Sequence, residues 1–105
     1  MRPFTKTLTV TGSTAWLPIN YSQNAFNMGV QVVTSGGASI VWAVEITNDN
    51  IYDSAITPIA TAAPAPMDTG TVTEIGNITI PCRAIRLTAT ITSGTVTMTV
   101  IQGRS

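Results

Sequence analysis

The acidic and amide side chains that follow residue 47 are the part of this sequence best suited to chemistry. The segment Asn48–Asp53 supplies four side chains with oxygen atoms of the kind that bind Ca²⁺. The D-x-D-x-D-G order of an EF-hand loop is absent, however, and Asn and Asp also gather in turns, where they bind nearby backbone N–H groups. We therefore expect a turn here and no metal ligands, with a calcium site as the alternative.

Paired carboxylates are the second chemistry to consider. The chain has five, at Glu45, Asp49, Asp53, Asp68 and Glu74. Two carboxylates at one cleft can hydrolyse a glycoside, but nothing in the spacing of Asp49 and Asp53 places them at a shared cleft. The chain has no histidine, which removes the commonest general base and zinc ligand. We expect no catalytic residue, no cofactor and no enzyme activity.

Two tryptophans raise the question of carbohydrate binding. Trp42 shares one face of a predicted strand with Ile40, Val44 and Ile46, so it is predicted to lie in the core. Trp16 stands near a proline in a poorly patterned segment, and both a core and an interface position stay open for it. A carbohydrate-binding module would need a row of exposed aromatic rings, so it is a distant alternative.

The remaining sequence indicates an all-β scaffold. Thr, Val and Ile supply 40 of the 105 residues, and these β-branched side chains favour strands. No window shows a sustained helical period. We predict one domain over residues 1–105, folded as a two-sheet antiparallel β-sandwich of seven to eight short strands, for which a jelly roll is one fitting topology.

Two pairs of alternating runs are predicted to form β-hairpins. Met28–Thr34 and Ser39–Thr47 are joined by a Gly-rich turn. Cys82–Thr92 and Thr95–Gln102 are joined by the turn T-S-G-T. Threonines occupy every second position of the last run, so they are expected to cover a sheet face without charge.

Further strands are expected on either side of these runs. Thr5–Thr11 alternates, which predicts a half-buried strand with Lys6, Leu8 and Val10 on one face. The segment 71–80 predicts either two short strands or one strand interrupted at Gly76.

Charge and cysteine content limit the classes of binding partner and the cell compartments that fit this chain. Five basic and five acidic residues cancel, so the chain has no electrostatic reason to bind nucleic acid or an anionic membrane. Weak charge repulsion also favours assembly. The single Cys82 excludes an intrachain disulfide, which fits a reducing compartment or indifference to redox state. We expect no secretory signal and no membrane span.

The irregular segments are the predicted sites of partner binding. They are an N-terminal arm at residues 1–4 and a long loop at residues 48–70, within which Thr57–Met67 is apolar, uncharged and Pro-rich. The candidate interface residues are Arg2, Pro3, Phe4, Trp16, Pro58, Ile59, Pro64, Pro66 and Met67. The alternative is that the loop folds back over the edge of its own sandwich.

A family resemblance rests on the second half of the chain. The segment W-A-V-E-I-T-N-D-N-I-Y-D, followed by a loop and then by P-C-R-A-I-R-L-T-A-T-I-T-S-G-T-V-T-M-T-V-I-Q-G, spans Trp42 to Gly103. It resembles a group of small β-sandwich structural proteins encoded by tailed bacteriophages, most of all in R-A-I-R-L, S-G-T-V-T and V-I-Q-G in that order. The Asp-rich turn of that group is diluted here to N-D-N-I-Y-D.

The resemblance implies a structural role in a virion. It points to a capsid decoration or cement protein on the capsid surface, made in the cytoplasm of a bacterial host. Its partners would be the major capsid protein or other virion subunits, together with copies of itself, with a trimer as the expected homo-oligomer. A small tail, tail-fibre or head-to-tail connector component is the alternative.

Overall fold

The computed structural model describes residues 4–19, 27–35 and 40–102, and these residues form nine β-strands. The strands are β1 (Phe4–Leu8), β2 (Gly12–Ser13), β3 (Leu17–Pro18), β4 (Met28–Ser35), β5 (Ile40–Thr47), β6 (Thr61–Ala62), β7 (Glu74–Ile78), β8 (Ala84–Ile91) and β9 (Thr95–Gln102). Within the described ranges, no helix is long and apolar enough to cross a membrane.

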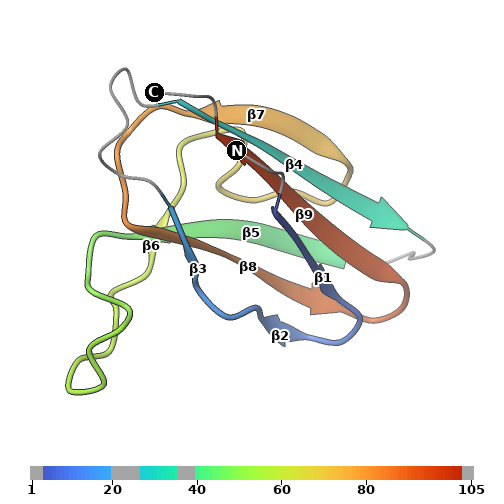
Figure 1. Ribbon diagram of the computed structural model, residues 1–105. Helices are drawn as coiled ribbons and strands as arrows, with labels where there is room; N and C mark the ends of the chain where they lie inside the picture. The colour runs from blue at the N-terminus through green and yellow to red at the C-terminus, as the bar shows by residue number, and fades with distance from the viewer. Residues whose placement is uncertain (1–3, 20–26, 36–39, 103–105) are drawn as a thin grey trace.

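The strands form two antiparallel sheets (Figure 1). Sheet A has the order β1-β9-β4-β7, and sheet B has the order β2-β8-β5-β6, with β3 also paired to β8. The predicted all-β fold of two packed sheets is therefore confirmed. Nine strands are present where seven or eight were expected, because β2, β3 and β6 are two-residue pairings too short for a sequence pattern to reveal. The jelly-roll topology stays a prediction.

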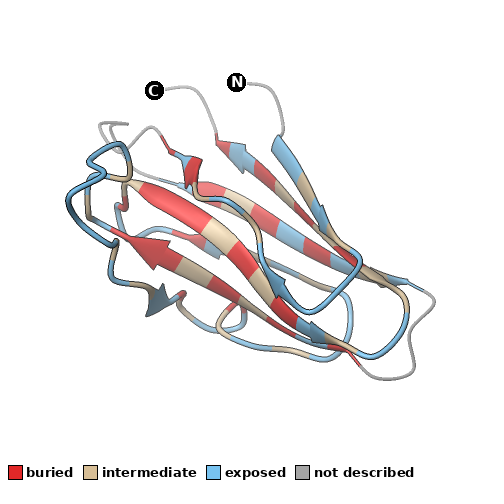
Figure 2. Cartoon of the chain, turned by 90° about the horizontal axis from the view of Figure 1, so that it is seen from below, coloured by how far each residue is buried: buried red, intermediate tan, exposed pale blue. Residues whose placement is uncertain are grey.

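The core lies between the sheets and follows the alternation of the long strands. Buried residues alternate with less buried ones along β4, β5 and β9, which Figure 2 shows as bands of colour. Because successive side chains of a strand point to opposite faces, each strand supplies one apolar row to the core. Trp42 is fully buried among these rows, which confirms its predicted core position.

The two predicted hairpins are wrong. β4 pairs with β7 and β9 in sheet A, whereas β5 pairs with β6 and β8 in sheet B, so the chain crosses between sheets after β4. It crosses again between β8 and β9, where Gly94 adopts a φ of 93° that favours glycine. Alternation specifies which face of a strand is buried, and that face is the same whether the next strand lies beside it or across the core.

Two further strand predictions need correction. β1 ends at Leu8, and Val10 beyond it is 69% exposed, so the expected inward row of Thr5–Thr11 stops early. The segment 71–80 contains one strand, β7, which runs through Gly76 without interruption. A Cβ at position 76 would lie 3.1 Å from Met67 Sδ in the core, which explains why a glycine stands inside this strand.

The second half of the 48–70 loop is part of the sandwich. Met67 O accepts a hydrogen bond from Val44 N at 3.1 Å, and Ala63 N donates to Val44 O at 3.0 Å. Gly70 and Trp42 exchange two backbone hydrogen bonds of 2.9 Å. The alternative reading, in which the loop folds back over the sandwich edge, therefore holds for residues 61–70. Residues 48–60 instead extend away from the sheets (Figure 1).

Candidate functional site

The segment after β5 is a set of turns held by its own acidic and amide side chains. Asp49 Oδ2 accepts a hydrogen bond from Ile59 N at 2.7 Å, and Asp53 Oδ1 accepts one from Ala55 N at 2.9 Å. Asn50 Oδ1 accepts from the backbone two residues ahead at 3.0 Å. The predicted turn-forming role of these side chains is confirmed. Within residues 4–19, 27–35 and 40–102, no group of three or more His, Cys, Asp or Glu could hold a metal ion.

Removing divalent cations is expected to leave the melting temperature unchanged. Oxygens of Asp49, Asn50 and Asp53 already accept backbone hydrogen bonds, so the turns do not need a cation to hold them. Thermal unfolding followed by circular dichroism with and without EDTA checks this. A fall of several degrees that Ca²⁺ reverses would contradict it and restore the calcium alternative.

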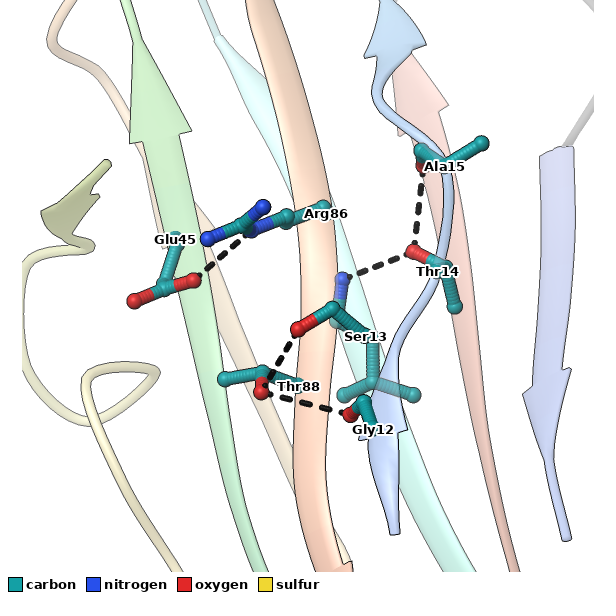
Figure 3. A network of polar contacts seen from close by, with 8 residues as sticks. Gly12, Ser13, Thr14, Ala15, Glu45, Arg86 and Thr88 are labelled. Carbon is teal, nitrogen blue, oxygen red and sulfur yellow. Dashed lines mark hydrogen bonds and ion pairs between the residues drawn. The ribbon is translucent and has the colours of Figure 1, made fainter. Parts of the chain in front are cut away.

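An ion pair stands on the outer face of sheet B. Arg86 Nε donates to Glu45 Oε1 at 2.8 Å, from neighbouring positions on β8 and β5 (Figure 3). The Arg86 guanidinium also lies over the Trp16 ring, 4.5 Å from its centre, a distance at which a cation is attracted to an aromatic face. Trp16 is half-buried, so one face of its ring is covered by an arginine and is not free to stack on a sugar.

Hydroxyl groups fix the segment that carries Trp16. Ser13 Oγ donates to Thr88 Oγ1 at 2.9 Å, and Thr14 Oγ1 accepts a hydrogen bond from Leu87 N at 3.1 Å (Figure 3). These contacts tie the chain between β2 and β3 to the edge of β8. Sequence reasoning missed this cluster. The signal was that Glu45 and Arg86 both point away from the buried faces of their strands.

Those predicted interface residues that the structure describes do not form one surface. Arg2 and Pro3 lie outside the described residues, and Phe4 is a strand residue of β1 paired with Val100, so the predicted arm does not include it. Phe4 is 40% exposed in sheet A, whereas the loop residues border sheet B.

Within the loop the candidates differ in exposure. Ile59 is 72% exposed, Pro66 is exposed, and Pro58 and Pro64 are half-buried. The expected exposure of Met67 is wrong: its side chain is fully buried in the core, because the backbone of this stretch is paired with β5.

Two cavities open at the end of sheet B where β5 ends and β8 begins. The first, of about 270 Å³, is lined by Asp49, Tyr52 and Arg83 among others, and Asp53 does not line it. The second, of about 370 Å³, is lined mainly by apolar side chains, including Ile46, Pro64, Ile80 and Pro81. Asp49 and Asp53 therefore do not face one cavity. Paired-carboxylate catalysis would need both carboxylates at the same cavity.

The single thiol is buried. Cys82 is 1% exposed, and burial raises the pKa of its thiol from 9.0 to about 11. We expect the native thiol to react with a disulfide reagent at about pH 8 roughly a hundredfold more slowly than the same thiol in the unfolded chain. The pKa of this thiol is higher in the folded chain than in the unfolded chain. Its contribution to stability is therefore fully present below pH 9 and is lost as pH rises toward 11.

The reaction can be followed by absorbance, with the chain in denaturant as the control. Equal rates for native and unfolded protein would show that Cys82 is accessible and would contradict the buried position.

The outer face of sheet A carries a second unusual surface. Its outward residues are Thr5, Thr7, Thr95, Thr97, Thr99, Ile101, Gly29, Gln31, Val33, Ser35, Ile75 and Asn77. None of these residues is ionisable. Val33, Ile75 and Ile101 are 37%, 71% and 50% exposed. Sequence reasoning foresaw the Thr-covered strand but not its neighbours, because the predicted hairpins placed β4 beside β5.

Comparisons with known proteins give no match: no protein-family model matches the chain, and no curated protein matches its sequence. The fold and surfaces of the chain therefore carry its functional interpretation.

Proposed function

We propose that this protein is a non-enzymatic structural component of a tailed-bacteriophage virion, a decoration or cement protein that binds the capsid shell. The resemblance of residues 42–103 to small phage sandwich proteins supports this role. The observation that carries it is the uncharged outer face of sheet A, a surface suited to contact between subunits because such contact removes no water from charged groups.

The chemistry-bearing side chains support a scaffold role as well. Glu45 is paired with Arg86, and Asp49 and Asp53 hold turns. Each of these carboxylates is thus engaged in local structure. A protein whose polar groups stabilise its own surface is suited to a mechanical task.

The proposed mechanism is burial of area across subunit boundaries. Copies of the sandwich bound to a shell add contacts between subunits that otherwise meet at a limited interface. No covalent step or cofactor is required. The gain is resistance of the shell to opening by heat or internal pressure.

Quantitative mass spectrometry of purified virus particles tests the proposal. A copy number in the hundreds per particle is expected for a decoration protein, and removing the gene should lower the temperature at which particles release DNA. A copy number of about six or twelve would instead identify a tail, tail-fibre or connector component, since such structures have low-order symmetry. Absence from the particles would overturn the virion role.

A carbohydrate-binding role finds less support. Trp42 is buried in the core, and one face of the Trp16 ring is covered by Arg86. Among the described residues, these two tryptophans therefore do not form a row of exposed rings for a sugar chain.

A further inference from the structure

We propose that the outer face of sheet A binds the same face of a second copy of this chain, as a two-fold symmetric pair. This goes beyond the virion role, because the pair would form from the purified protein alone. The candidate surface consists of the twelve outward residues of β1, β9, β4 and β7 named above, and it is called the neutral face from here on.

The neutral face is continuous across all four strands. The paired strands place Thr5, Thr99, Gln31 and Ile75 in one row across the sheet. The exposed side chains of Val33, Ile75 and Ile101 lie next to Gly29 and Gln31 on this surface. They provide apolar contact area without an isolated charge.

Four of its hydroxyl groups already have partners within the sheet. Thr7 Oγ1 and Thr97 Oγ1 lie 3.1 Å apart, and Thr5 Oγ1 and Thr99 Oγ1 lie 3.5 Å apart, each pair sharing a hydrogen bond. Burying a polar group costs free energy mainly when it loses its partner. These threonines can therefore enter an interface and present their methyl groups to it.

Absence of charge is what makes a second copy a fitting occupant. In a two-fold pair each residue meets its counterparts on the same patch of the partner. A face with charged residues then risks placing like charges together, whereas the neutral face brings no such repulsion. The outer face of sheet B is less suited, since it carries the Arg86–Glu45 ion pair.

The size of the face is adequate for a weak, specific pair. β4 and β9 have eight residues each, and β1 and β7 have five. At about 3.4 Å per residue and about 4.8 Å between strands, the sheet covers roughly 400 Å² in projection. Two copies would together bury roughly 800 Å² in projection, within the range of weak interfaces below about 1,200 Å².

The edges of sheet A are protected against the competing mode of association. Lys6 on β1 shares the inward face of Met98, and Glu74 on β7 shares the inward face of Val32. Inward-pointing charges on edge strands discourage a second sheet from pairing with them. Protected edges and an uncharged face together favour stacking over edge-to-edge pairing.

Gly29→Lys is the sharpest test. A Cβ at position 29 meets only Ile101 O at 3.7 Å, so a side chain fits the fold and projects from the neutral face. Sedimentation velocity over a range of micromolar concentrations should show a dimer for the native chain. Gly29→Lys should raise its dissociation constant by about a hundredfold or more, because each copy would bury an unpaired charge in the interface.

Val41→Lys is the matched control, since Val41 is 50% exposed on the outer face of sheet B. It should dimerise as the native chain does. Melting curves establish whether each variant is folded. If Gly29→Lys does not fold, Ile101→Lys serves as the second disruptive variant.

A native chain that stays monomeric at these concentrations would overturn the inference. So would a trimer, or a dimer that is weakened by Val41→Lys and unaffected by Gly29→Lys. Particle mass spectrometry and sedimentation address different questions, so failure of the virion role and failure of the pair are distinguishable.

Discussion

Trp42→Ala is expected to lower the free energy of unfolding by about 3–5 kcal/mol. The indole is fully buried, and its Nε1 donates a hydrogen bond to Val72 O at 2.9 Å. Truncation would leave a large cavity between the sheets and an unpaired carbonyl oxygen in the segment that leads into β7. Urea unfolding followed by circular dichroism measures the loss.

Trp16→Ala is the control for this variant. Trp16 is half-buried and stacked under Arg86 at the surface, so its loss should cost much less than that of Trp42. A loss below about 1 kcal/mol for Trp42→Ala would place the indole outside the core and reopen the carbohydrate-binding interpretation.

Gly70→Ala is expected to destabilise the protein by about 2–4 kcal/mol, although it adds one methyl group. A Cβ at position 70 would stand 2.8 Å from Trp42 Cε2 and closer still to Cζ2. Gly70 also exchanges two backbone hydrogen bonds with Trp42, so the backbone cannot withdraw without breaking them.

Gly29→Ala is the matched glycine control. Its Cβ would meet only a backbone oxygen at 3.7 Å, and alanine in a strand restricts the unfolded chain more than glycine does. Stability should stay the same or rise by a few tenths of a kcal/mol. Similar losses for the two substitutions would show that the close approach of Gly70 to Trp42 does not govern its effect.

The alternation of apolar residues was enough to predict the fold class and much of the core. Trp42 and its strand neighbours lie inward, as their period of two requires. Asn50 and Asp53 hold turns, as their residue types favour. These features depend on local geometry and local burial, which the sequence encodes directly.

Strand partners and the docked half of the loop could not be predicted in the same way. The buried face of β4 is equally consistent with a neighbour in its own sheet and with a crossing to the other sheet. Residues 61–70 attach to β5 through backbone hydrogen bonds, which any residue type can form. Met67 therefore looked like an exposed apolar residue of a Pro-rich loop until the tertiary structure placed it in the core.

The hydrogen bond from Ile59 N to Asp49 Oδ2 has a consequence for protein engineering. It closes the loop formed by residues 50–58, whose tip around Ser54 is exposed. The entropic cost of closing a loop grows slowly with its length. A peptide inserted at Ser54 should therefore leave this hydrogen bond and the two sheets intact. If the chain is repeated over a particle surface, each copy would then present one inserted epitope on a loop whose two ends are held together.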